Sequence, residues 1–180
     1  MKMDNHYEYL LLAFEEAEKA KEEGTYPIGA VIIDSNGTVV SRGRNRVFSS
    51  YDTTSHAEVD AIRKAGHKIL DVESKKFVVD NGLTLYTTCE PCPMCTGTIV
   101  LSKIKKVVWA ANDAEIGAFK KFKERTSPLP IYNDLFNDIE IVAAPYSDLE
   151  IRQRLMLAEW NNNRGYTDNH WNKEFIRDAE

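Results

Sequence analysis

Hydrophobic and polar residues alternate along the chain with two different periods, which predict both helices and strands. Apolar positions recur at helical spacing over residues 6–23 and 148–160, with charged residues between them. Short apolar runs bounded by turn residues, such as 27–33 and 83–88, have the length of strands. The predicted helices are 6–23, 56–65, 93–102 and 148–160, and the predicted strands are 27–33, 38–44, 83–88, 106–110 and 139–143.

The order of these elements predicts an α/β fold. Turn residues 34–37 join the first two strands as a hairpin, whereas residues 67–81 show no clear pattern. We expect one three-layer α/β/α domain, in which a five-stranded mixed sheet carries helices on both faces. Residues 1–146 would form the catalytic core. Residues 147–180 would form a C-terminal helix and tail of the same domain, and this tail is a candidate cover for the active site.

Composition and charge narrow the class of protein. The chain has 180 residues, of which 43% are hydrophobic, so it can bury the core of one ordinary domain. Its 23 Lys and Arg residues face 28 Asp and Glu residues, and a net charge of -5 argues against nucleic-acid binding driven by charge alone. No apolar run is long enough for a membrane span, and no signal-peptide layout is visible at the start. We therefore expect a cytoplasmic protein without a membrane partner.

Three cysteines lie within seven residues, at Cys89, Cys92 and Cys95. Such a tight, odd-numbered set is typical of metal ligation or redox chemistry in a reducing compartment. Cys92 and Cys95 are one helical turn apart, just where Pro93 indicates the start of a helix. With His56 they could form a catalytic zinc site that keeps an open position, or with Cys89 a closed structural site. An iron–sulfur cluster would usually need a fourth cysteine, which the chain lacks.

Two short motifs give a resemblance to a known family. His56-Ala57-Glu58, followed by Pro91-Cys92-Pro93-Met94-Cys95, resembles the H-x-E…P-C-x-x-C signature of the zinc-dependent cytidine deaminase-like superfamily. The resemblance extends over about residues 5–145 and implies the cytidine deaminase-like fold. It implies that His56, Cys92 and Cys95 bind Zn²⁺ and that the metal lowers the pKa of a bound water. Glu58 would be the catalytic residue that carries protons, rather than a ligand.

The resemblance also suggests a substrate class. Residues 88–95 are most similar to guanine and guanosine deaminases, while residues 85–88 and 95–97 are equally similar to fungal-type cytosine deaminases. The leading hypothesis is a zinc-dependent hydrolase of amidine C–N bonds that deaminates a free nucleobase or nucleoside, most of all a guanine-type purine. The first alternative is a tRNA-specific adenosine deaminase that converts the wobble adenosine to inosine, and the second is a cytosine deaminase. Relatives of the tRNA type tend to carry Leu at the position of Cys89.

By the same resemblance, Asn45 and main-chain groups near Ala30, Cys89 and Glu90 would bind the substrate, although Asn45 is also typical of a residue that satisfies a turn. A residue from the later chain would close the pocket. The candidates are Asp113, Glu115, Phe119, Trp160, Trp171 and Phe175. The lysine-rich stretch 103–125 predicts a solvated face, or else an RNA contact. His6, His67 and His170 lie in polar contexts typical of exposed residues. Relatives are commonly oligomers, so we expect a homodimer.

Overall fold

The computed structural model describes residues 5–124 and 130–172 and, within them, a main sheet of five strands in the order β2-β1-β5-β6-β7. The central part consists of β1 (Gly29–Ile33), which is antiparallel to both of its neighbours, β2 (Val39–Arg44) and β5 (Thr84–Cys89). The strands β6 (Lys106–Ala111) and β7 (Glu140–Ala143) then extend the sheet in parallel with β5. The sheet is therefore mixed, as the sequence predicted.

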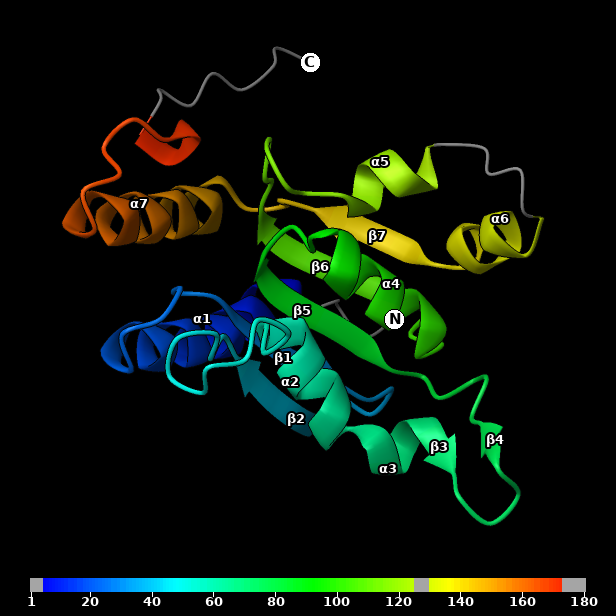
Figure 1. The fold of residues 1–180 in the computed structure, drawn as a ribbon. Helices are drawn as coiled ribbons and strands as arrows, with labels where there is room; N and C mark the ends of the chain where they lie inside the picture. Colours follow the sequence, from blue (N-terminus) through cyan, green and yellow to red (C-terminus); the bar gives the residue numbers. More distant parts are fainter. Residues whose placement is uncertain (1–4, 125–129, 173–180) are drawn as a thin grey trace.

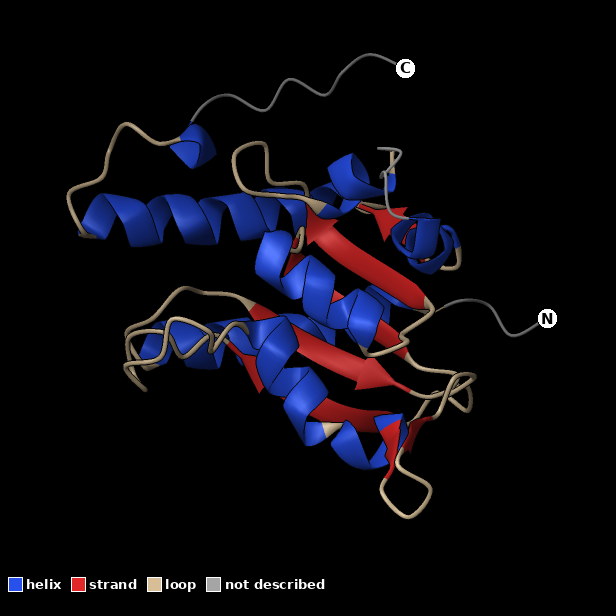
Figure 2. Cartoon of the chain, turned by 45° about the vertical axis from the view of Figure 1, so that its right-hand side comes forward, coloured by secondary structure: helices blue, strands red, loops and turns tan. Residues whose placement is uncertain are grey.

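Helices cover both faces of this sheet (Figure 1). The helices α1 (His6–Glu22) and α7 (Ser147–Asn163) pack on one face, and α2 (Ala57–Lys64) and α4 (Pro93–Leu101) pack on the other. Figure 2 shows the same layers from a second direction.

The burial pattern of β1 explains the three-layer arrangement. Ala30 and Ile32 belong to the core on the α2 side, whereas Val31 and Ile33 belong to the core on the α1 side. Side chains of a strand alternate between its two faces, so a continuous apolar run such as β1 requires cover on both. The predicted three-layer α/β/α fold is confirmed.

Several short elements were not predicted. Residues 66–77 form α3 (Gly66–Ile69) and a small hairpin of β3 (Leu70–Asp71) and β4 (Lys76–Phe77) outside the main sheet. Both strands of this hairpin are exposed, so the sequence carries no alternation of buried and exposed positions there. Two further helices, α5 (Phe119–Lys123) and α6 (Pro130–Asn137), connect β6 to β7.

The C-terminal helix is longer than predicted. α7 continues through Asn161–Asn163 and ends where Gly165 adopts a φ of 84°. The N–H groups of Gly165 and Tyr166 donate to the carbonyl oxygens of Asn162 and Asn161, which is the pairing of a Schellman motif. A short 3₁₀ helix, η1 (His170–Asn172), follows in the predicted tail, and Phe175 lies outside the described residues.

Helix length and polarity also bear on the membrane question. In the described parts of the chain, every helix is too short or too polar to cross a lipid bilayer.

Candidate active site and metal centre

The reactive side chains lie at the starts of two neighbouring helices. His56 is the N-cap of α2, with φ −76° and ψ 157°, and Cys92 is the N-cap of α4, with φ −67° and ψ 173°. Both residues are thus still extended while the next residue is helical, and Pro93 occupies the first turn of α4, where helices tolerate proline. The two helix starts therefore present an imidazole and a thiol toward each other, as the sequence predicted.

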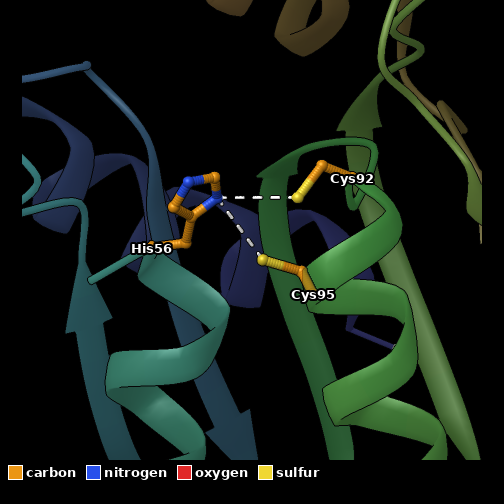
Figure 3. Close-up of side chains that lie close together, drawn as sticks. All are labelled: His56, Cys92 and Cys95. Carbon is orange, nitrogen blue, oxygen red and sulfur yellow. Dashed lines mark hydrogen bonds between the residues drawn. The ribbon is translucent and has the colours of Figure 1, made fainter. Parts of the chain in front are cut away.

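The three predicted zinc ligands converge on one point (Figure 3). His56 Nδ1 lies 3.7 Å from Cys92 Sγ and 3.5 Å from Cys95 Sγ, and the three ligand atoms all lie within 4.8 Å of one another. A tetrahedral zinc ion with ordinary Zn–N and Zn–S bonds separates such atoms by about 3.5 Å. The donor set and its spacing therefore fit zinc without any rearrangement of the backbone.

Cys89 does not belong to this group of ligands. Among the described residues, the cluster that can hold a metal ion consists of His56, Cys92 and Cys95. Cys89 is buried at the end of β5 and packs instead against Leu157, Ala158 and Trp171. Three protein ligands are typical of a catalytic zinc site that leaves a fourth position for water or substrate. The geometry thus favours the open site over the closed structural site with four ligands.

The thiols and the imidazole perturb one another strongly. Hydrogen bonds from Cys95 and His56 lower the pKa of Cys92 to about 4. The hydrogen bond with Cys92 correspondingly raises the pKa of His56, against the effect of burial. The thiolate of Cys92 also lies at the N-terminus of α4, where the helix dipole and unpaired N–H groups favour negative charge. This is the charge state that a zinc ligand requires.

Glu58 lies beside the ligands but is not one of them. It is the second residue of α2 and only 4% exposed, and its Oε2 accepts a hydrogen bond from Cys95 Sγ at 3.3 Å. Burial raises the pKa of this carboxyl group, although the neighbouring His56 partly opposes the effect. A carboxyl group with a raised pKa can both accept and release a proton near neutral pH, as proton transfer requires.

The position of α2 depends on a close approach to β2 that was not predicted from the sequence. A Cβ atom at Gly43 would lie 2.3 Å from the carbonyl oxygen of Ala57 and 2.4 Å from the nitrogen of Ala61. Ser41 Oγ donates to the carbonyl oxygen of Ala61 at 2.8 Å. The signal available in the sequence was a glycine inside a predicted strand, which often marks such an approach.

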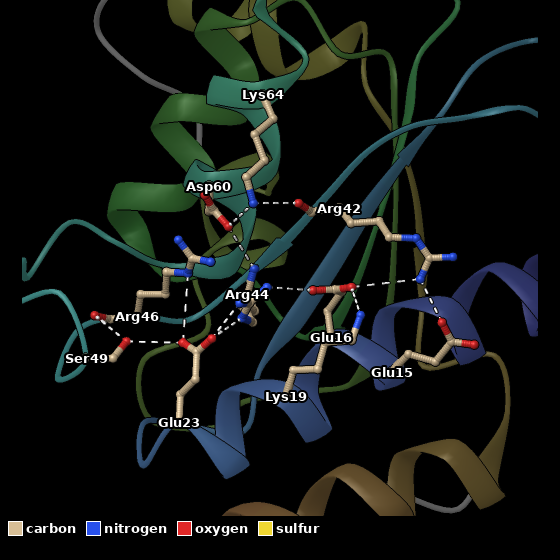
Figure 4. Close-up of polar contacts among 10 residues, drawn as sticks. All are labelled: Glu15, Glu16, Lys19, Glu23, Arg42, Arg44, Arg46, Ser49, Asp60 and Lys64. Atoms are coloured by element: carbon tan, nitrogen blue, oxygen red, sulfur yellow. Dashed lines mark hydrogen bonds and ion pairs between the residues drawn. The ribbon is translucent and has the colours of Figure 1, made fainter.

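Polar contacts strengthen the same junction (Figure 4). Asp60 on α2 accepts the backbone N–H of Arg44, while Lys64 donates to the carbonyl oxygen of Arg42 at 2.9 Å. On the other side of β2, Glu16 of α1 is buried and forms an ion pair with Arg44 at 3.3 Å. β2 is therefore held between α1 and α2, which fixes the helix that carries His56 and Glu58.

Asn45 follows β2 and is almost fully buried. Its Oδ1 accepts hydrogen bonds from Thr25 Oγ1 at 2.7 Å and from the N–H of Val47 at 3.1 Å. Its backbone N–H donates to the carbonyl oxygen of Ile28. Asn45 therefore does satisfy the turn, and these contacts leave the Nδ2 amide group as its candidate donor to a substrate.

The other predicted substrate contacts lie on the central strands. Ala30 is in the middle of β1, where it pairs with Gly43 and Thr87. The backbone N–H of Glu90 donates to the carbonyl oxygen of Ala111, so this donor is already occupied. The carboxylate of Glu90 accepts the N–H groups of Asp113 and Lys120, which attaches it to the loop after β6 and to the start of α5.

Two of the candidates from the later chain, Phe119 and Trp160, pack among other aromatic side chains. Phe119 is fully buried against Trp109 and Phe136, which places it in the core. Trp160 packs against Tyr26 and Phe48 at the start of the loop that leads to His56.

Two expectations about histidines were wrong. His170 is not an exposed residue, because its side chain is only 13% exposed and lies between Asp113 and Glu115. His6 is also buried, and its Nδ1 lies 2.9 Å from the hydroxyl group of Tyr86. Only His67 is exposed as expected. A polar sequence context cannot show which loop a histidine will meet in space.

The sequence profile of the cytidine and deoxycytidylate deaminase zinc-binding region matches residues 3–111, which is more than half of the chain. The chain belongs to this deaminase family. It is therefore a hydrolytic enzyme of the family that acts on C–N bonds of nucleobases or nucleosides, and zinc is its cofactor.

Two kinds of deaminase are similar to this chain. A tRNA-specific adenosine deaminase of Aquifex aeolicus is 38% identical over 109 residues, which is 61% of this chain and 68% of that protein. The guanine deaminase of Bacillus subtilis is 36% identical over 140 residues, or 76% of this chain and 80% of that protein. A solved structure from a study of A-to-I editing by tRNA:A34 deaminases superposes with a TM-score of 0.62 at 28% identity, covering 77% of this chain and 98% of that one.

These similarities support the fold, but the similar proteins do not all act on the same substrate. Three tRNA-specific adenosine deaminases reach 38%, 41% and 39% identity, yet the chain spans only 68%, 63% and 58% of their lengths. By identity, the tRNA alternative has more support than the guanine hypothesis. Coverage does not reverse this, because a tRNA-specific adenosine deaminase of Buchnera aphidicola is 32% identical over 159 residues, which is 88% of this chain and 91% of that protein.

Proposed function

We propose that this chain is a zinc-dependent hydrolytic deaminase of a purine ring, presented as a free base or a nucleoside. The observation that carries the proposal is the placement of a buried, proton-accepting carboxylate, Glu58, beside three convergent zinc ligands. The names of the similar proteins support a purine, since they refer to adenosine in tRNA and to guanine.

Three residues would bind the metal and a fourth would transfer protons. His56, Cys92 and Cys95 would hold the zinc ion, which when bound lowers the pKa of water toward neutrality. Glu58 would take a proton from that water and pass it to a ring nitrogen of the substrate. The hydroxyl oxygen would bond to the ring carbon that carries the amino group. Glu58 would then take the remaining proton from this hydroxyl group and pass it to the amino nitrogen, so that the C–N bond breaks, ammonia leaves and a carbonyl group replaces the amine.

The charge of the C-terminal region supports a small substrate. Residues 147–180 contain five Lys and Arg residues against seven Asp and Glu residues, which leaves little positive charge for phosphates. In the stretch 103–125, Lys105 and Lys106 form ion pairs with Asp138 and Glu140 at 2.9 and 3.1 Å. Side chains already paired with carboxylates contribute less to RNA binding, so the prediction of a solvated face suits this stretch better.

A second candidate is deamination of the wobble adenosine in tRNA. It is favoured by the identity of 38–41% to tRNA-specific adenosine deaminases. An RNA hairpin would present its base to the same metal centre after flipping it out of the loop.

The test is ammonia release from the purified zinc protein. The substrates are guanine, guanosine, adenine, adenosine, cytosine, cytidine and a tRNA anticodon stem-loop, and Glu58→Gln serves as the inactive control. Release from a purine base or nucleoside, absent in the control, is the expected result. Release from the stem-loop alone would overturn the small-substrate proposal in favour of tRNA editing, and release from cytosine or cytidine alone would overturn the purine assignment. The predicted homodimer can be measured on the same preparation by light scattering.

A further inference from the structure

Asn45 lies between two backbone hydrogen bonds that attach it to the segment of the metal ligands. On one side, the N–H of Arg44 donates to Asp60 Oδ2 on α2 at 3.1 Å. On the other side, the N–H of Arg46 donates to the carbonyl oxygen of Ser55 at 2.8 Å, and Ser55 directly precedes the first zinc ligand. Asn45 is therefore fixed beside the start of the helix that carries the proton-transferring carboxylate.

The orientation of the Asn45 side chain follows from its two hydrogen-bond donors. The N–H of Val47 donates to Oδ1 at 3.1 Å. A backbone N–H can only donate, so the atom opposite it has to be the amide oxygen and not the amide nitrogen. Thr25 Oγ1 lies 2.7 Å from the same oxygen and donates its proton to it. The amide nitrogen Nδ2 therefore points away from both donors.

The hydroxyl group of Thr25 is oriented in turn by a third backbone group. The N–H of Phe48 donates to Thr25 Oγ1 at 3.4 Å, which leaves the hydroxyl proton for Asn45. Thr25 is fully buried, and Asn45 is only 1% exposed. Hydrogen bonds that are shielded from bulk solvent and linked in series strengthen one another. The Thr25 hydroxyl group thus belongs to a defined chain of donors that ends at Asn45 Oδ1.

Glu23 at the end of α1 holds the segments of Thr25 and Asn45 together (Figure 4). Its Oε1 accepts a hydrogen bond from Arg44 Nε at 2.7 Å, and its Oε2 accepts one from Ser49 Oγ at 3.2 Å. These two donors lie before and after Asn45 in the chain. The loop after β2 is therefore connected on both sides of Asn45 to the segment that carries Thr25.

We propose that Thr25 is a positioning residue: its hydroxyl group keeps Asn45 Oδ1 turned to the protein, so that Asn45 offers the substrate only the N–H donors of Nδ2. The inference rests on the proposed function, because it requires a base bound beside the metal centre. It adds the kind of substrate atom that Asn45 recognises, which is a hydrogen-bond acceptor such as a ring nitrogen with a lone pair or a carbonyl oxygen. An amide free to turn over would accept a donor equally well.

The experiment removes the Thr25 hydroxyl group while keeping the shape of the side chain. Thr25→Val does this, Thr25→Ser restores the hydroxyl group, and Thr25→Ala repeats the comparison if Thr25→Val does not fold. The matched control is Thr98→Val, because the Thr98 hydroxyl group donates only within its own helix, to the carbonyl oxygen of Met94 at 2.9 Å. Zinc content, thermal unfolding, kcat and KM for the preferred purine are measured for each protein.

Two further readouts identify the route of the effect. The Nδ2 proton signals of Asn45 are followed by NMR of the ¹⁵N-labelled protein without substrate, and Asn45→Ala assigns them. Inhibition constants are measured for analogues that each lack one acceptor of the base. These are the 3-deaza and 7-deaza forms of the preferred purine and, for guanine, 2-aminopurine, which lacks the carbonyl oxygen.

We expect Thr25→Val to keep its zinc and to lower kcat/KM by roughly tenfold, mainly through KM, because the donor to the substrate is no longer held while the proton carrier is untouched. The Nδ2 signals should shift or broaden in Thr25→Val and stay in place in Thr25→Ser. Thr25→Ser and Thr98→Val should remain within about twofold of the wild-type kcat/KM. One analogue, which lacks the recognised acceptor, should bind equally well to the wild type and to Thr25→Val.

The outcomes distinguish failure of this inference from failure of the proposed function. Unchanged Nδ2 signals in Thr25→Val would overturn the positioning role, whichever substrate the enzyme uses. Altered signals with an unchanged kcat/KM, or equal weakening of the purine and of every analogue, would overturn the recognition of an acceptor by Asn45. A wild-type protein that acts only on the stem-loop would refute the proposed small substrate, while the Nδ2 signals would still decide whether Thr25 holds Asn45.

Discussion

Gly43 allows a direct test of how the fold places the metal ligands. This residue lies on β2 where α2 crosses it, and α2 begins with His56 and carries Glu58. The substitution Gly43→Ala adds a single methyl group at this crossing. It changes no charge and touches neither a ligand nor the proton carrier, so any effect on the metal must come through the position of the helix.

The structure gives the size of the effect. The new Cβ would lie 2.3 Å from the carbonyl oxygen of Ala57, whereas ordinary van der Waals contact begins at 3.4 Å. Because both neighbours are backbone atoms, α2 must move away from β2 by about 1 Å. Metal–ligand distances tolerate deviations of only about 0.2 Å. Overpacking of this kind costs roughly 1–3 kcal/mol, which a domain of ordinary stability can survive.

We therefore expect a folded Gly43→Ala protein with zinc affinity weakened at least about tenfold and turnover lowered by roughly a hundredfold. Zinc affinity is measured by competition with a chelator, stability by thermal unfolding, and turnover by ammonia release. The matched control is Gly97→Ala on α4, where an added Cβ meets no atom within 4 Å. That control should keep its zinc and gain up to about 1 kcal/mol in helix stability. Normal zinc affinity and turnover in Gly43→Ala would refute the argument that this crossing positions the ligands.

Three further substitutions test the site. Glu58→Gln should keep its fold and zinc but lose turnover by about 10²–10⁴-fold, since it removes the proton carrier; a near-normal rate of ammonia release would contradict this. Cys89→Ser should still bind about one zinc per chain by metal analysis, because Cys89 lies outside the ligand cluster, and loss of metal would support a closed site instead. Hydrogen bonds from Thr54 and Ser55 lower the pKa of Asp52 to about 2, which is below the pKa of an Asp in the unfolded chain. The ionised carboxylate therefore stabilises the fold fully above about pH 4, and this stabilisation is lost as the pH falls toward 2. Asp52→Asn should accordingly be less stable than the wild type at pH 7, and chemical denaturation should show the difference closing toward pH 2; a constant difference would contradict the assignment.

The parts of the site that depend on local sequence could be predicted. Helix starts at His56 and beside Cys92 were predicted, the second because Pro93 is tolerated best in a first turn, and the spacing from Cys92 to Cys95 fixes their common face. The strands of the main sheet could be predicted because burial on two faces leaves continuous apolar runs such as β1.

What could not be predicted depends on contacts between distant segments. Gly43 affects the metal ligands through the position of α2. The contact of His170 is with Asp113, in a loop more than fifty positions earlier in the chain. Neither has a local pattern that identifies its partner. The exposed hairpin of β3 and β4 was missed for a different reason, because a strand with both faces in solvent produces no hydrophobic period.

The match to the family includes the metal centre but not the later part of the chain. The family match ends at residue 111, and it includes His56, Glu58 and both ligand cysteines. Asp113, His170 and Trp171 all lie beyond it. Identity within the matched part therefore reports on the metal centre and proton transfer, which deaminases of tRNA and of free bases share. The matches over 140 and 159 residues extend past residue 111, and they include a guanine deaminase and a tRNA-specific adenosine deaminase. Identity therefore does not decide between an RNA and a small purine, and the choice has to be measured by ammonia release from each substrate.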